Sequence, residues 1–326
     1  MANVLNQLLE QKEVVVADGA MGTNLFELGL ANGACGELWN VAQPEDVRSV
    51  HQSFVDAGSD IILTNSFGAN RFRFALHKFE SRVRELNMAG AAIAREVAEK
   101  AARPIVVAGS MGPTGDMLEP LGTRTPPEVE AAFHEQAQAL REGGVDIAWI
   151  ETMFADNELD AAIAGVQRAG LPYVATMTFD TGGRTMMGVW PADAVRRVQS
   201  LAHKPLAFGA NCGVGPAQLL DSVLGLKKSA DENAVIVAKG NCGIPQMGND
   251  MKIRYTGTPE VMSDYVCLAR DAGARIIGGC CGTTAYHMRA MVEALRSRPR
   301  EAPPDYEKIE RLLGPLKKTV ELSRAV

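Results

Sequence analysis

ARIIGGCC, residues 274–281, is the last of eight short apolar segments that recur along this 326-residue chain. Each segment is rich in small or branched apolar residues and is bounded by turn residues, which is typical of strands buried on both faces of a sheet. The other seven are Val14–Ala20, Asp60–Phe67, Pro104–Met111, Asp146–Thr152, Tyr173–Asp180, Leu206–Cys212 and Ala234–Cys242. The sequence therefore predicts eight buried strands.

Stretches with helical periodicity separate these strands. They are Pro44–Ala57, Arg82–Ala101, Pro127–Gly143, Ala155–Ala169, Pro191–Leu201, Pro216–Leu224, Pro259–Ala272 and about Ala285–Arg296, and the glycine-rich segment Gly22–Trp39 has the weakest helical pattern. Alternating strands and helices predict a parallel α/β sheet with right-handed crossovers, and eight such units most simply close into a (β/α)8 TIM barrel. An open doubly wound sheet is the alternative, but no Gly-x-Gly-x-x-Gly motif opens the first helix.

The barrel is expected to form a single domain over residues 1–297, followed by a C-terminal extension over residues 298–326. Three prolines, Pro299, Pro303 and Pro304, begin the extension, and the charged stretch Tyr306–Ser323 after them is expected to be helical. The extension could pack on the barrel, contact a second subunit or be part of a linker. The sequence does not distinguish these alternatives.

Composition narrows the class of protein. The chain is 46% hydrophobic and 22% charged, with a net charge of −6 and no run of lysine or arginine, so a nucleic-acid partner is not expected. It has no apolar stretch of transmembrane length, and Met1–Glu13 lacks a signal-peptide core. We therefore expect a cytoplasmic protein that acts on small molecules away from membranes, and a homo-oligomer is compatible with the sequence. In that compartment the six cysteines should be thiols or metal ligands rather than disulfides.

Three cysteines fall at the ends of predicted strands. Cys212 ends the sixth, in the motif GANCG at 209–213, and Cys280 with Cys281 ends the eighth. Neighbouring strand residues point to opposite faces, so an adjacent pair can bind one ion only where the strand bends, which the flanking glycines allow. Three thiolates suit Zn²⁺ and leave one tetrahedral position open, as in catalytic zinc sites. The alternative is three buried thiols that pack as small hydrophobic groups.

The remaining cysteines are less suited to this role. Cys242 ends the strand between the other two, so it could close the site as a fourth ligand, although we favour a neighbouring non-ligand. Cys35 lies in a predicted loop and Cys267 in a predicted helix, and both are expected to be inert.

Catalytic groups of a TIM barrel lie at the carboxyl ends of its strands. Asp18 and Glu151 occupy such positions, where a carboxylate can bind a substrate ammonium group, act as a base or cap the next helix. The backbone N–H groups at Gly19 and Ala20 could receive a substrate carboxylate. Among the aromatic residues near strand ends, Trp39 and Phe67 could form the wall of a donor pocket for a methylated cation, or they could simply pack.

Four motifs together resemble those of the homocysteine S-methyltransferase family. They are DGAMGT at 18–23, TNSFGAN at 64–70, GANCG at 209–213 and GGCCGT at 278–283. The resemblance covers roughly residues 10–297, and the chain looks most like bacterial betaine–homocysteine S-methyltransferases. It implies a (β/α)8 barrel with zinc held by Cys212, Cys280 and Cys281. It also implies that Asp18 and Glu151 contact the amino group of homocysteine, while backbone near Gly19 and Ala20 holds the amino acid.

The activity that this resemblance implies is zinc-dependent transfer of a methyl group from glycine betaine to L-homocysteine, giving methionine and dimethylglycine. The chain departs from the animal betaine enzymes at Phe67-Gly68, where those enzymes carry adjacent aromatics. The alternatives keep the acceptor and change the donor to S-methylmethionine, S-adenosylmethionine, a sulfoniopropionate or methylcobalamin on a separate protein. A non-catalytic zinc-binding barrel is an alternative of another class.

Overall fold

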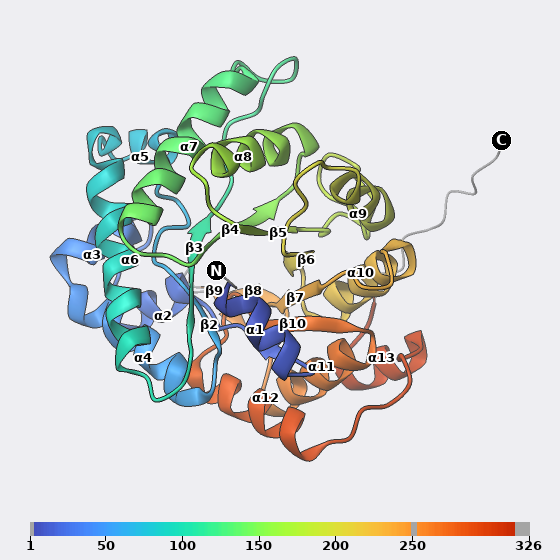
Figure 1. The fold of residues 1–326 in the computed structure, drawn as a ribbon. Helices are drawn as coiled ribbons and strands as arrows, with labels where there is room; N and C mark the ends of the chain where they lie inside the picture. The colour runs from blue at the N-terminus through green and yellow to red at the C-terminus, as the bar shows by residue number, and fades with distance from the viewer. Residues whose placement is uncertain (1–2, 249–252, 317–326) are drawn as a thin grey trace.

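The computed structural model describes residues 3–248 and 253–316. Eight parallel strands stand side by side in a ring (Figure 1), and an isolated bridge between Ala17 and Ile61 joins the first strand to the second. The strands are β1 (Val15–Val16), β2 (Ile61–Leu63), β3 (Val106–Met111), β4 (Ile147–Met153), β5 (Tyr173–Met177), β6 (Ala207–Cys212), β7 (Ile236–Gly240) and β10 (Ala274–Gly279). All eight predicted strands are present, and the predicted TIM barrel is confirmed.

Helices surround the barrel on its outer side (Figure 1). They are α2 (Met21–Glu27), α3 (Trp39–Ala42), α4 (Pro44–Ala57), α5 (Arg71–Ala75), α6 (Val83–Lys100), α7 (Pro126–Glu142), α8 (Asp156–Arg168), α9 (Pro191–Gln199), α10 (Pro216–Ser229), α11 (Pro259–Asp271) and α12 (Ala285–Ser297). Five of them begin with proline, whose fixed φ and missing N–H suit a first helical turn. The weakly patterned segment Gly22–Trp39 is broken into α2 and a short 3₁₀ turn, Gly36–Leu38.

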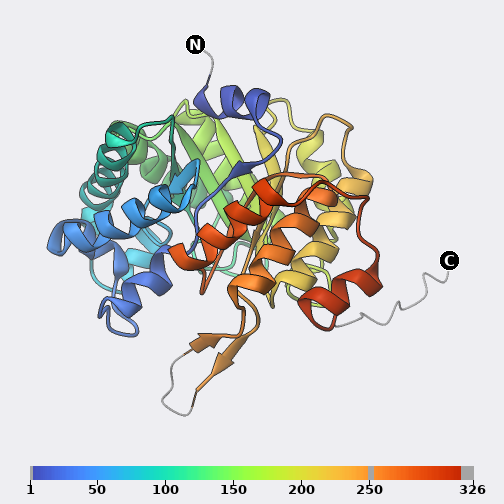
Figure 2. The same ribbon diagram turned by 90° about the horizontal axis from the view of Figure 1, so that it is seen from below.

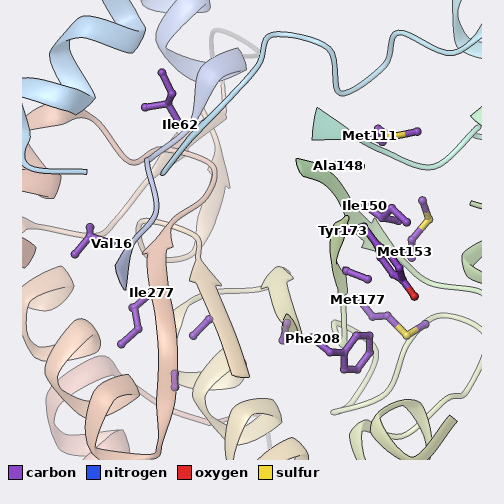
Figure 3. Close-up of a cluster of buried hydrophobic side chains, with 14 of the residues drawn as sticks. Val16, Ile62, Met111, Ala148, Ile150, Met153, Tyr173, Met177, Phe208 and Ile277 are labelled. Atoms are coloured by element: carbon purple, nitrogen blue, oxygen red, sulfur yellow. The ribbon is translucent and has the colours of Figure 1, made fainter. Parts of the chain in front are cut away.

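Side chains alternate between the inside and the outside of the barrel along every strand. Those pointing outward pack under the helices, and Figure 3 shows several of them, including Ile62, Ile150 and Ile277. Those pointing inward form a second, separate apolar cluster, centred on the fully buried Trp149. The barrel is therefore a filled core rather than a channel.

The helix α1 (Val4–Gln11) closes the end of the barrel where the strands begin (Figures 1 and 2). Its Leu5 and Leu8 are buried in the inner apolar cluster. The side chain of Asn3 caps the helix by accepting a hydrogen bond from the N–H of Leu5. This helix was not predicted, although Val4, Leu5, Leu8 and Leu9 have the spacing of one helical face and were the signal that could have revealed it.

A β-hairpin at the opposite end of the barrel was also not predicted (Figure 2). Its strands, β8 (Pro245–Met247) and β9 (Ile253–Tyr255), pair antiparallel and lie between β7 and α11. Met247 and Ile253 are exposed, and in the described strands of the hairpin only Tyr255 is partly buried, so the pattern of apolar residues gives little sign of it.

The described part of the C-terminal extension packs on the barrel. Helix α13 (Tyr306–Leu313) begins after Asp305, whose side chain caps it, and ends at Gly314 with φ of 93°. Ile309 is fully buried in the outer core. The helix is thus shorter than the predicted stretch Tyr306–Ser323, of which residues 317–323 lie outside the described part. No helix in the described residues is long and apolar enough to span a membrane.

We expect Leu5→Ala to lower the free energy of unfolding by ~2–4 kcal/mol, because it leaves a cavity in the closed end of the barrel. The exposed Gln7 on the same helix provides the control, and Gln7→Ala should change stability by less than ~0.5 kcal/mol. Urea unfolding followed by circular dichroism measures both. Equal effects of the two substitutions would contradict the role assigned to α1.

Candidate active site

Three thiols come together where the strands end. The Sγ atoms of Cys212, Cys280 and Cys281 all lie within 4.8 Å of one another. Cys212 is the last residue of β6, the other two follow β10, and β7 lies between them as predicted. A tetrahedral ion with Zn–S bonds of about 2.3 Å would need sulfur atoms about 3.8 Å apart. The three thiols are therefore already spaced for one tetrahedral metal ion.

The backbone around the thiols is held in turn conformations. Cys212 has φ of 63°, which is uncommon for a residue with a side chain, and Gly213 after it has φ of 81°. Asn241, which follows β7, ties the two cysteine loops together. Its amide nitrogen donates to the carbonyl of Gly213 at 2.5 Å, and its oxygen accepts from the N–H of Cys281 at 3.1 Å.

The chemistry of the donor set suits a cation. The hydrogen bond of Cys280 with Cys212 and the burial of its side chain raise the pKa of the Cys280 thiol. A bound metal would replace the protons of the three thiols, since thiolates are the ligand form. The three thiols thus fit the ligand set that Zn²⁺ prefers, and binding of the ion would release the thiol protons.

Cys242 lies apart from this group among the described residues. It is buried, and its Sγ donates to the carbonyl of Gly257 at 3.5 Å. Cys35 donates to the carboxylate of Glu37 at 3.3 Å, and Cys267 is buried in α11. None of these three belongs to the group of converging sulfur atoms found in the described residues.

A layer of polar side chains covers the inner apolar cluster, directly below the thiols. Glu151 is buried on β4 and accepts a hydrogen bond from the hydroxyl of Ser110 at 2.5 Å. The amide nitrogen of Asn211 lies 3.5 Å from Glu151 and 3.9 Å from the Sγ of Cys280. The amide oxygen of Asn211 accepts from the hydroxyl of Thr176 at 2.7 Å. Asn211 therefore links the predicted carboxylate to the predicted metal centre.

Asp18 lies in the same polar layer and has a partner that the sequence analysis missed. The Nζ of Lys239 lies 2.8 Å from Asp18 Oδ1 and 3.0 Å from the Asp18 carbonyl. Burial acts to lower the pKa of Lys239, but the negative charges of Asp18, Glu151 and Cys280 outweigh it and raise that pKa. A lysine in the apolar segment Ala234–Cys242 was the signal that could have revealed this pair.

The other predicted contacts are placed as follows. The N–H of Ala20 donates to the carbonyl of Thr283 at 3.1 Å, and Gly19 lets that carbonyl approach closely. Trp39 is buried in the outer core. Phe67 packs against Gly112, and the guanidinium of Arg73 lies 5.7 Å from its ring centre. Both predicted donor-pocket aromatics are thus already in contact with the protein.

Tyr255 on β9 brings the unpredicted hairpin onto the thiol group. Its ring lies against Gly282, so closely that a side chain at that position would collide with it. Its hydroxyl forms a hydrogen bond with the side chain of Cys281. Burial first, and then the charge of Cys281, raise the pKa of the Tyr255 hydroxyl. The hairpin therefore forms one wall of the site.

The family model of homocysteine S-methyltransferases matches residues 15–295. The chain belongs to this family. The methionine synthase of Mycobacterium tuberculosis is 31% identical to this chain, and the match covers 91% of this chain and 26% of that protein. The methionine synthase of Mycobacterium leprae is 30% identical, and the match covers 87% of this chain and 24% of that protein. The chain spans about a quarter of the length of these curated relatives.

Solved structures agree on the fold. The homocysteine methyltransferase MmuM from Escherichia coli, in its metallated form, is 24% identical with a TM-score of 0.74, covering 90% of this chain and 100% of that one. The oxidized form of the same enzyme is 25% identical with a TM-score of 0.73, and the match covers 90% of this chain and 99% of that one.

We expect Cys280→Ala to abolish stoichiometric metal binding, because two thiolates and a vacancy hold zinc far more weakly than three. Cys242→Ala is the matched control: it removes a buried thiol from a neighbouring strand end and should leave one metal per chain. Metal content by mass spectrometry, together with sulfur-to-cobalt absorption in Co²⁺-substituted protein, measures both. Full metal content in Cys280→Ala would refute the assigned ligands.

Proposed function

We propose that this chain is a zinc-dependent enzyme that methylates L-homocysteine to methionine, with Cys212, Cys280 and Cys281 as the metal ligands. The convergence of the three thiols at the barrel mouth carries this proposal, and the family match supports it. Bound zinc would lower the pKa of the substrate thiol, so that its sulfur is a nucleophile near neutral pH.

The chain's own residues would hold and orient the amino acid. Glu151 and Asp18 provide negative charge for its ammonium group, and Ser110 fixes the Glu151 carboxylate in one orientation. Backbone near Gly19 would hold the rest of the amino acid. Tyr255 and the half-buried setting of the thiols limit water at the sulfur.

The reaction requires little proton transfer. The substrate thiol would release its proton to solvent as the thiolate forms, and the sulfur would then attack the methyl carbon of a cationic donor in line. A sulfur–carbon bond forms as the bond from carbon to the donor's nitrogen breaks, and the electron pair stays on the nitrogen, which leaves neutral. Holding the two substrates collinear and dry is therefore the main task of the site.

For the donor we propose glycine betaine, which would leave as dimethylglycine. The sequence resemblance to bacterial betaine–homocysteine S-methyltransferases supports this choice. The aromatic ring of Phe67 would be the chain's contribution to the quaternary ammonium group, whereas Trp39 is buried in the outer core.

A second donor class is favoured by a different observation. The curated relatives are methionine synthases about four times the length of this chain, so most of each relative lies outside the homocysteine-binding part. Exposed apolar residues such as Leu121, Met187 and Ile244 on the loops of the site face would suit a protein that brings the methyl group. Methylcobalamin on a separate protein is thus the second candidate.

We expect zinc-loaded protein with homocysteine and betaine carrying deuterated methyl groups to form trideuterated methionine, because the methyl group moves intact. Mass spectrometry of methionine and dimethylglycine measures the transfer, with Cys280→Ala as the inactive control. Each other donor is offered singly in parallel: S-methylmethionine, S-adenosylmethionine, a sulfoniopropionate and methylcobalamin. Labelled methionine from another donor, with none from betaine, would refute the betaine assignment while keeping the acceptor.

A further inference from the structure

The hairpin formed by β8 and β9 extends away from the mouth of the barrel (Figure 2). Every residue of β8 is exposed, and so are Ile253 and Arg254 of β9. Tyr255, the last residue of β9, is the one partly buried residue of these two described strands. A two-stranded hairpin is at best marginally stable in water by itself, so its position over the mouth depends on what holds its base.

Two contacts connect the base of the hairpin to Cys281. The N–H of Cys242, which precedes the hairpin, donates to the carbonyl of Cys281 at 2.8 Å, and the carbonyl of Cys242 accepts from the N–H of Gly257, which follows it, at 2.9 Å. The second contact is the hydrogen bond between the hydroxyl of Tyr255 and the side chain of Cys281. The first contact involves only residues that flank the hairpin, whereas the second comes from one of its strands.

The ring of Tyr255 is seated beside the cysteine pair, where Gly282 has no side chain. A Cβ added at Gly282 would lie within 2.6 Å of three Tyr255 atoms, two of them in the ring. The packing of this ring and the hydrogen bond of its hydroxyl can therefore be separated, because phenylalanine at position 255 would keep the first and lose the second.

Metal binding would change the acceptor of this hydrogen bond. A cysteine thiol is a weak hydrogen-bonding partner, whereas a cysteine that binds a metal is a thiolate and carries negative charge. A hydrogen bond to an ionised acceptor is roughly twice as strong as one between neutral groups. The bond from the Tyr255 hydroxyl to Cys281 should therefore strengthen when the metal binds, and the base of the hairpin should be held more firmly.

We propose that Tyr255 is a positioning residue that couples the hairpin to the metal centre: its hydroxyl donates to the Cys281 thiolate, so that metal binding fixes the hairpin at the mouth. This coupling rests on the proposed function, because Cys281 has to be a metal ligand. Coupling between two equilibria is reciprocal. The factor by which the metal stabilises the seated hairpin is thus also the factor by which the Tyr255 hydroxyl strengthens metal binding.

The first measurement is the zinc affinity of the full chain, determined by competition with a chromophoric chelator. Tyr255→Phe should bind zinc about tenfold more weakly than the wild type, which is the size of effect expected for a group that hydrogen-bonds a metal ligand. Tyr286→Phe is the matched control, because Tyr286 follows the same cysteine pair in sequence but is 67% exposed. The control should bind zinc within about twofold of the wild type.

The second measurement is amide hydrogen exchange in β8 and β9, followed by mass spectrometry with and without zinc. Zinc should slow this exchange about tenfold in the wild type and in Tyr286→Phe, and should have little effect on it in Tyr255→Phe. The loss of affinity and the gain in protection should agree, since they report one coupling free energy.

The outcomes separate this coupling from the proposed function. If Tyr255→Phe binds zinc as tightly as the wild type or more tightly, or if zinc still protects its hairpin, the coupling is wrong while the metal site stands. Wild-type protein that binds no zinc would refute the proposed function itself, and the coupling with it.

Discussion

The ion pair between Lys239 and Asp18 is the interaction on which the mouth of the barrel depends. It joins the end of β7 to the end of β1, the neighbours of β10 on its two sides, and so frames the strand that carries Cys280 and Cys281. Removing one partner of such a buried pair costs about 3–5 kcal/mol, because the other charge is left without water or counter-ion. The pair therefore joins the two strands that flank the one leading to Cys280 and Cys281.

The side chains that point into the barrel form two layers, an apolar layer that fills the core and a polar layer nearer the mouth. Val237 and Lys239 both point inward from β7, but the first belongs to the apolar filling and the second to the polar layer above it. Trp149 and Glu151 repeat this arrangement on β4. On each of these strands, two inward-pointing residues that are two positions apart therefore lie in different layers, the first apolar and the second charged.

Much of this architecture could be predicted from the sequence, because it depends on local periodicity. The helix Pro44–Ala57 has the predicted bounds, and the three cysteines meet because parallel strands bring their carboxyl ends to one rim. What could not be predicted depends on contacts between distant segments. The burial of Trp39 and the contact of Tyr255 with Gly282 require the folded chain, and the hairpin that carries Tyr255 is otherwise exposed in its described strands. A lysine in an apolar segment pointed to a buried charge, but only the fold identifies Asp18 as its partner.

Helix α1 has a consequence for turnover. Because Leu5 and Leu8 seal the end where the strands begin, both substrates and both products of the proposed reaction must pass through the mouth on the opposite side. In the proposed reaction the amino acid would bind deeper, near Glu151, and the methyl donor would approach from above its sulfur. A donor already in place would block that route, so the kinetic mechanism should be ordered: homocysteine arrives first, and methionine departs last.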